Sequence, residues 1–143
     1  MQQNNTFHKV TGTERHMYGP EKLLVCGYAK DEHKQILRFL SRLGFEAIPV
    51  VFVSNNDAHT TLHDLLKRKG NTGIGKDSGL KRAVIMSGFT EKNLTTLLSA
   101  YRKEGLPKQL WATLTPTSEK WPINFLLNEL QKEAEAINAR RKE

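Results

Sequence analysis

Apolar residues in the first half of this chain alternate between short continuous runs and stretches with helical spacing. The runs Leu23–Cys26 and Ile48–Val53 have the length and residue types of strands buried on both faces. After each run, apolar residues recur at steps of three and four, as in an amphipathic helix. The first group is Ile36, Leu37, Phe39, Leu40 and Leu43, and the second is Leu62, Leu65 and Leu66. This half therefore predicts strand, helix, strand, helix.

The second half repeats this order. Strands are predicted over 83–86 and 110–114, from the same spacing rules. One helix is predicted between its N-cap Thr90 and Gly105, and Thr117 or Ser118 leads into the last helix, with Pro122 in its first turn. Shifting the chain against itself by 61 residues, without a gap, aligns the two halves. Few residues keep their type; they are Gly27, Leu37, Gly44, Leu65 and Leu66. We interpret the offset as the mark of a duplicated unit.

Strands that alternate with helices favour a sheet with helices on both faces. We predict an α/β fold made of a duplicated (βαβα)2 unit, with a four-stranded, mainly parallel sheet in the order 2-1-3-4. A pseudo-two-fold axis parallel to the strands would then put the first helix of each unit on opposite faces. A split or mixed sheet is the alternative, because hydrophobic spacing does not determine strand order.

A chain of 143 residues is expected to form one domain. We expect a flexible N-terminal segment over 1–20, in which Phe7–Val10 could add a short edge strand. The single domain is predicted over 21–143. Its expected parts are repeat one (21–66), a basic glycine-rich connector (67–82), repeat two (83–130) and a helical extension (131–143).

Composition predicts a soluble cytoplasmic protein. No apolar run approaches the roughly 18 residues of a membrane span, and the polar N-terminus lacks the apolar stretch of a signal peptide. The single cysteine, Cys26, excludes an intramolecular disulfide and fits a reducing compartment.

The formal net charge of +7 is concentrated in the connector. Six basic residues stand there against one acidic residue, Asp77: Lys67, Arg68, Lys69, Lys76, Lys81 and Arg82. Such a cluster could bind nucleic acid or another polyanion, although a solvated, mobile surface loop is the simpler interpretation. The segment Gly70–Lys76 resembles the start of a phosphate-binding loop. However, Asp77 stands where Ser or Thr is needed and no strand precedes it, so no nucleotide site is predicted.

Two glycine turns suggest a small-molecule site. In a parallel 2-1-3-4 sheet, the turns after the two central strands meet at the edge where open α/β sheets bind ligands. The candidate ligand-binding residues are Cys26, Gly27, Tyr28, Ser87, Gly88, Phe89, Thr115 and Thr117. The alternative is a structural role, in which each glycine relaxes a turn and each aromatic ring packs beside it. No acid, base and nucleophile converge, so we predict no catalytic residue, metal or cofactor.

The segment Leu114-Thr115-Pro116-Thr117, followed by Trp121, carries a recognisable pattern. Together with Ser87–Glu91, it resembles family 3783 among the domains of unknown function, a family of small bacterial proteins. The resemblance extends over roughly 22–130. It implies a compact cytoplasmic α/β domain without an assigned activity, and it implies no functional residue.

These observations favour a non-enzymatic interaction module that binds an anionic partner or another protein chain. The last helix carries an apolar stripe beyond the repeat, made of Leu130, Ala134 and Ile137. An exposed stripe of this kind predicts a homodimer through the C-terminal helix, or packing on the same domain. The alternative function is a small-molecule or anion-binding protein, or an enzyme, with its site at the Gly27 and Gly88 turns.

Overall fold

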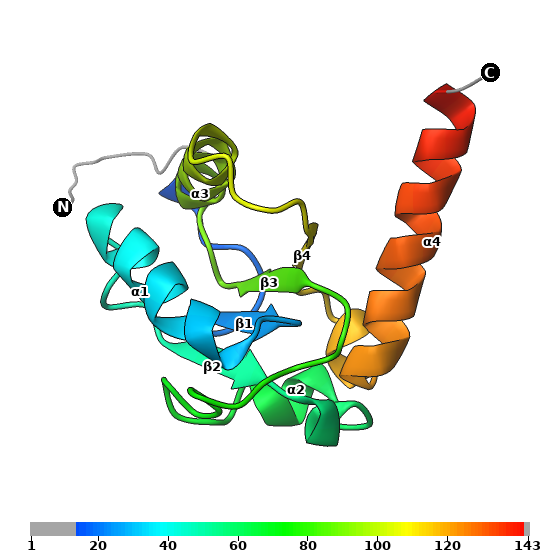
Figure 1. Ribbon diagram of the computed structural model, residues 1–143, viewed down its shortest axis with the longest axis horizontal. Coiled ribbons are helices and arrows are strands. Elements are labelled where there is room, and N and C mark those ends of the chain that lie inside the picture. Colours follow the sequence, from blue (N-terminus) through cyan, green and yellow to red (C-terminus); the bar gives the residue numbers. More distant parts are fainter. Residues whose placement is uncertain (1–13, 142–143) are drawn as a thin grey trace, which may run out of the picture.

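The computed structural model describes residues 14–141 (Figure 1). Its strands are β1 (Lys22–Cys26), β2 (Val50–Val53), β3 (Ala83–Ser87) and β4 (Leu110–Thr113). Its helices are α1 (His33–Arg42), α2 (Leu62–Leu65), α3 (Glu91–Lys103) and α4 (Ile123–Arg141). Short 3-10 helices precede three of them: η2 (Lys30–Glu32), η3 (Asn55–Asp57) and η4 (Ser118–Lys120). Among the described residues, no helix has both the length and the apolar character to cross a membrane.

The four strands form one sheet in the order β2-β1-β3-β4, so the predicted α/β class and strand order are confirmed. The prediction of a mainly parallel sheet is wrong. The pairs β1–β2 and β3–β4 are parallel, but the central pair β1–β3 is antiparallel, with Leu24 opposite Ile85. The sheet is therefore mixed. A strand buried on both faces has the same continuous apolar sequence in either direction, so spacing carried no signal for this reversal.

The antiparallel central pair also changes the helix layers. Helices α1 and α3 pack on one face of the sheet, and α2 and α4 pack on the other (Figure 1). The expectation that the first helices of the two halves lie on opposite faces is therefore wrong. Successive strand residues point to alternate faces, so Leu23 joins the α1/α3 core while Leu24 joins the α2/α4 core.

Backbone pairing follows the 61-residue offset. Leu23 pairs with Val50, and the positions 61 residues later, Val84 and Trp111, pair with each other. The same holds at the start of α2 and α4, where the Leu62 amide donates to Trp121 and the Ile123 amide donates to Thr60, at 3.0 and 2.9 Å. The two halves thus share strand register as well as element order.

The connector packs along the outer edge of β2. The Asn71 amide donates to the Val50 carbonyl at 2.6 Å, and the Phe52 amide donates to the Thr72 carbonyl at 2.9 Å. A Cβ atom at Gly73, where φ is +84°, would collide with the Phe52 carbonyl. This glycine is therefore needed for close approach to the strand, and the connector, predicted as a mobile surface loop, is bonded to β2 at Asn71 and Thr72.

The N-terminal residues 14–20 contact the other end of the sheet. The Met17 amide donates to the Phe89 carbonyl at 2.8 Å, and His16 forms an isolated bridge with Thr90. The edge strand predicted over Phe7–Val10 lies outside the described residues.

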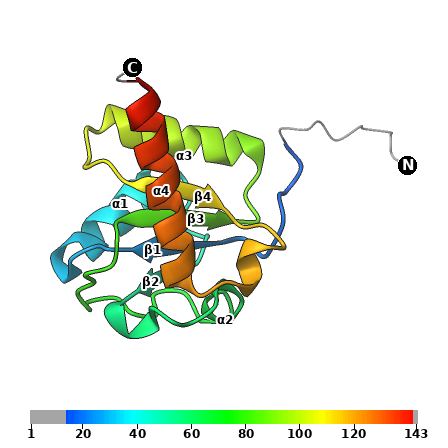
Figure 2. The same cartoon turned by 90° about the vertical axis from the view of Figure 1, so that its right-hand side faces the viewer.

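Helix α4 crosses the sheet and continues past β4 (Figure 2). Its buried residues are Ile123, Leu126 and Leu127, and they cover the sheet face opposite α1 and α3. Beyond Leu127 its residues are half-buried or exposed.

Candidate functional site

The predicted ligand-binding residues lie at two opposite ends of the sheet. Cys26, Gly27 and Tyr28 follow β1, whereas Ser87, Gly88 and Phe89 follow β3, which runs antiparallel to β1. Thr115 and Thr117 follow β4, which is parallel to β3, so they lie at the Gly88 end. The structure therefore forms no single site between the two glycine turns.

The Gly88 end is closed by the N-terminal residues. The Gly88 amide donates to the Tyr18 carbonyl at 3.0 Å, and Phe89 is 1% exposed. A Cβ atom at Gly19 would collide with the Ser87 hydroxyl. The N-terminal residues thus pack directly against this turn, which favours the structural interpretation at this end.

Thr115 takes part in a local turn. Its amide donates to the Ser118 hydroxyl at 3.1 Å, and the Ser118 amide donates to the Thr115 hydroxyl at 3.0 Å. These reciprocal bonds satisfy the backbone where β4 leads into η4. Thr117 is exposed in the same turn. The Leu-Thr-Pro-Thr segment thus has a structural explanation.

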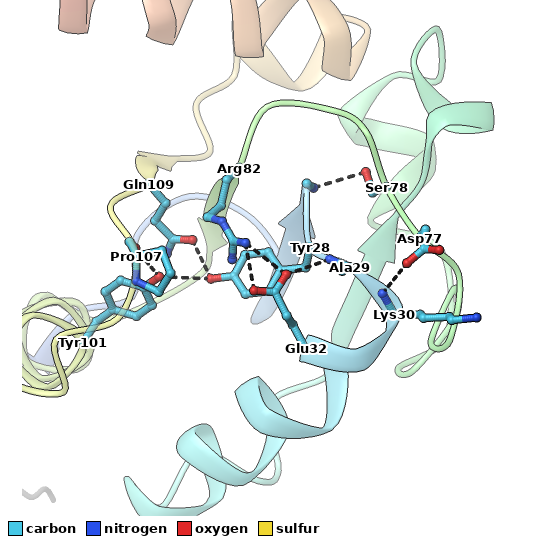
Figure 3. Close-up of polar contacts among 11 residues, drawn as sticks. Tyr28, Ala29, Lys30, Glu32, Asp77, Ser78, Arg82, Tyr101, Pro107 and Gln109 are labelled. Carbon is cyan, nitrogen blue, oxygen red and sulfur yellow. Dashed lines mark hydrogen bonds and ion pairs between the residues drawn. The ribbon is translucent and has the colours of Figure 1, made fainter.

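The Gly27 end carries a polar cluster around Tyr28 (Figure 3). The Arg82 guanidinium carbon lies 4.3 Å from the centroid of the Tyr28 ring, which is cation–π geometry. Its Nη2 donates to both carboxylate oxygens of Glu32, at 2.9 and 2.8 Å. Glu32 also accepts from the Ala29 amide at 2.7 Å. Glu32 thereby holds the Arg82 guanidinium over the aromatic ring.

Two buried tyrosine hydroxyls continue the cluster. The Tyr28 hydroxyl donates to Gln109 Oε1 at 2.5 Å and lies 3.4 Å from the Tyr101 hydroxyl. Tyr101 donates to the Pro107 carbonyl at 2.6 Å. Burial, and then the Tyr101 hydroxyl, raise the pKa of Tyr28 above its usual range, although Arg82 opposes the shift. Tyr28 is therefore a neutral hydrogen-bonding group and not a base.

A cavity of about 380 Å³ adjoins this cluster. One wall is a stripe of α1 that includes Ile36 and Phe39, and the other is the end of α3 with Leu106. At the outer end, Arg42 Nη2 lies 3.2 Å from Glu104 Oε2. Tyr28, Glu32 and Arg82 line the inner end. This is a concave site with apolar walls and polar ends, the usual form of a small-molecule pocket.

Sequence reasoning identified Tyr28 and Arg82 but assigned them to different sites. It missed Glu32, Tyr101 and Gln109, which come from η2, α3 and the segment before β4. Only the antiparallel register, with Cys26 opposite Ala83, brings Arg82 beside the turn after β1. No sequence pattern carried that information.

Cys26 is fully buried at the end of β1, with 0% exposure. Burial, with a smaller contribution from the Asp57 charge, raises the pKa of its thiol well above the usual range. Because the thiolate is the reactive form, Cys26 is unsuited to nucleophilic chemistry and serves as a small core residue.

The six basic residues assigned to an anionic partner do not form one free patch. Arg68 pairs with Asp57 at 2.9 Å, Arg82 with Glu32 at 2.8 Å, and Lys67 lies 3.9 Å from Asp64. The remaining three are exposed, and one of them, Lys81, donates to Asn128 at 3.1 Å; they are Lys69, Lys76 and Lys81. Arg68 and Arg82 are therefore engaged by carboxylates within the protein, whereas the exposed contact between Lys67 and Asp64 is weak.

Glu119 joins two elements on the surface. It accepts from the Tyr18 hydroxyl at 2.5 Å and lies 3.1 Å from His63 Nδ1. Within residues 14–141, no three or more His, Cys, Asp or Glu side chains are grouped so that they could hold a metal ion.

Residues 82–137 match the model of a family described as a domain of unknown function (DUF3783). The matched segment begins at Arg82 and contains β3, α3, β4 and most of α4. Comparisons with curated proteins and with solved structures find no match. The resemblance to this family, which rested on Ser87–Glu91 and Leu114–Trp121, is thus confirmed across 82–137 of the chain.

Proposed function

We propose that this protein is an interaction module that binds another protein chain along the outer edge of β4 and the distal part of α4. A second copy of the same chain is the partner that we propose first. The observation that carries the proposal is a difference between the two edges of the sheet: the β2 edge is covered, and the β4 edge is open.

The two edges differ in the hydrogen bonds of backbone groups that stand 61 positions apart in the sequence. On β2, the outward groups of Val50 and Phe52 bond to the connector. On β4, Leu110 and Leu114 donate toward β3, so the alternate residues Trp111 and Thr113 face outward. Those two residues are 61 positions after Val50 and Phe52, yet no described residue bonds to their outward groups. An open edge of this kind can pair with another strand.

The distal part of α4 supports the same partner. The helix continues past β4 (Figure 2). Leu130 packs against the α2/α4 core, Ala134 is half-buried, and Ile137 is 44% exposed. Antiparallel pairing of two β4 strands would extend the sheet beneath this part of α4 and bury Ile137. A two-fold arrangement of this kind places the same surface of each copy against the other, which favours a second copy as the partner.

Replacing Thr113 by proline tests whether the outer edge of β4 pairs with another strand. It removes an outward amide donor without touching the bonds to β3. We expect Thr113→Pro to raise the dimer dissociation constant at least tenfold, whereas Thr113→Val, which keeps the amide, should change it less than threefold. Sedimentation equilibrium gives both constants, and circular dichroism reports the fold. Equal constants for the two folded variants would contradict pairing through β4.

Binding of a polyanion by the connector has narrower support, because three of its six basic residues pair with carboxylates. The three without an acidic partner among the described residues are Lys69, Lys76 and Lys81. If duplex DNA binds, three phosphate contacts predict a slope of log K against log salt of about −3, and six predict about −5. Fluorescence anisotropy over a salt series measures the slope. We expect a slope no steeper than about −3; a value near −5 would mean that the ion-paired residues leave their carboxylates for DNA.

We further infer that the two halves are copies of one βαβα unit. The shared register supports this, and so do the positions around the two glycine turns. A Cβ atom at Gly27 would meet Leu80 and Arg82, and one at Gly88 would meet Gly19 and Glu21, 61 positions earlier. In the pairs Leu24–Ile85 and Thr61–Pro122, the second residue stands 61 positions after the first. Each pair therefore joins equivalent positions of the two halves. Nuclear Overhauser effects between the two residues of each pair are expected, and their absence would contradict the inference.

The alternative function is binding of a small molecule, and one observation, at the Gly27 turn, favours it. That observation is the cavity beside Tyr28.

A further inference from the structure

The cavity beside Tyr28 has the dimensions of a ligand site. Its volume of about 380 Å³ falls within the range of roughly 300–1,000 Å³ found for small-molecule pockets. The middle is apolar, with Ile36 and Phe39 on one wall and Leu106 and Pro107 on the other. A flat ring or a branched aliphatic group fits between these walls. The cavity lies on the α1/α3 face of the sheet, opposite the face that α4 covers.

The inner end offers hydrogen-bond donors and acceptors side by side. One nitrogen of Arg82 makes both bonds to Glu32, so the guanidinium keeps further N–H groups for another acceptor. The Tyr28 and Tyr101 hydroxyls donate their protons to Gln109 and Pro107, which leaves acceptor lone pairs on both oxygens. A group that accepts from Arg82 and donates to a neighbouring oxygen would be complementary to this end.

An unsatisfied group lies behind the two tyrosines. The amide nitrogen of Gln109 is buried and has no hydrogen-bond partner, although its oxygen accepts from Tyr28. Buried donors without partners are uncommon and need an explanation. A polar molecule that reorganises the tyrosine hydroxyls would provide the missing acceptor.

The lining is electrically balanced. Arg82 pairs with Glu32 and Arg42 pairs with Glu104, and Tyr28 stays protonated because burial raises its pKa. A charged ligand would have to break an ion pair to gain a partner of its own. A neutral ligand with a donor and an acceptor on one edge avoids that cost, and an amide edge has this arrangement.

We propose that this cavity binds a small, uncharged molecule with an amide-type edge, such as an aromatic amide or a lactam. The amide edge lies at Arg82 and Tyr28, and the apolar body lies between Phe39 and Leu106. The site does not depend on the β4/α4 face, so either proposal can fail without the other.

Three probes that share one ring distinguish a neutral ligand from an anionic or a cationic one. They are benzamide, benzoate and benzylamine. Titration of ¹⁵N-labelled protein, followed by amide chemical shifts, measures each affinity. For a ligand of this size we expect benzamide to bind with a Kd of about 1 mM and to shift resonances of Gln35, Tyr101 and Leu106. We expect benzoate and benzylamine to bind at least tenfold more weakly. Tightest binding by a charged probe, or no saturable shift with benzamide at these residues, would overturn the proposal.

A matched pair of variants locates the site. Gln35 is an exposed residue of α1 that lines the cavity, and Arg38 is an exposed residue of the same helix that does not. We expect Gln35→Trp to fill the cavity and weaken benzamide at least tenfold, whereas Arg38→Trp leaves the affinity unchanged. Arg82→Met removes the donors and should also weaken benzamide tenfold. Retained affinity in folded Gln35→Trp and Arg82→Met would overturn the proposal.

Discussion

Replacing Gly27 by alanine is expected to lower the free energy of unfolding by about 3 kcal/mol. Its φ of +77° costs an alanine about 1 kcal/mol, and the new Cβ atom would lie 2.5 Å from the Leu80 carbonyl and 2.6 Å from the Arg82 backbone. Overpacking against backbone adds roughly 1–3 kcal/mol. Thermal unfolding should therefore show a Tm lower by about 9 °C for a chain of this size.

Gly44 provides the control. Its φ is +84°, but no atom lies within 4 Å of a Cβ atom built there. Gly44→Ala should lose only the conformational part, about 1 kcal/mol or a Tm lower by about 3 °C. Equal losses at the two positions would mean that the segment 80–82 does not press on the turn that positions Tyr28 and Arg82.

If the proposed dimer forms through α4, the double substitution of Leu130 and Ile137 by glutamate should convert it into a monomer. Each apolar side chain contributes about 1.5–3 kcal/mol when fully buried, so partial burial of the two together contributes about 2.8 kcal/mol to the dimer. Because 1.4 kcal/mol is a factor of ten, losing both should raise the dissociation constant at least about 100-fold. Ile137 is exposed, whereas Leu130 is half-buried and packs against the α2/α4 core, so circular dichroism must show that the variant is folded. Sedimentation velocity measures the change.

Ile74 is the matched control for Ile137. It is also an exposed isoleucine, at 42% compared with 44%, but it lies in the connector at the opposite edge of the sheet. Ile74→Glu should leave the sedimentation coefficient unchanged. If Ile74→Glu dissociates the dimer and the α4 variant does not, the interface lies on the β2 side and the proposal for α4 is wrong.

The order of strands and helices could be predicted from the sequence, because the spacing of apolar residues indicates which positions are buried. The runs at Leu23–Cys26 and Ala83–Ser87 are buried throughout, as continuous apolar residues predict. Strand direction was not accessible, since a strand with helices on both faces presents the same pattern either way. The reversal depends on the connector, which follows the β2 edge and enters β3 at the Gly27 end.

The candidate site was harder to predict from the sequence than the fold, for a related reason. Gly27 and Tyr28 were found from their place after a strand, but their partners come from separate segments. Arg82 had been grouped with basic neighbours, although its position over the Tyr28 ring and beside Glu32 gives it a different role. Side chains from distant segments meet only when register is known, and one sequence does not contain that register.

Sedimentation equilibrium of the wild-type chain over a wide concentration range tests the central claim most directly. An open β4 edge and the exposed Ile137 of α4 predict the mass of a dimer, twice 16.3 kDa, with a shift toward monomer on dilution. A single mass of 16.3 kDa at every concentration would contradict association through β4 and α4.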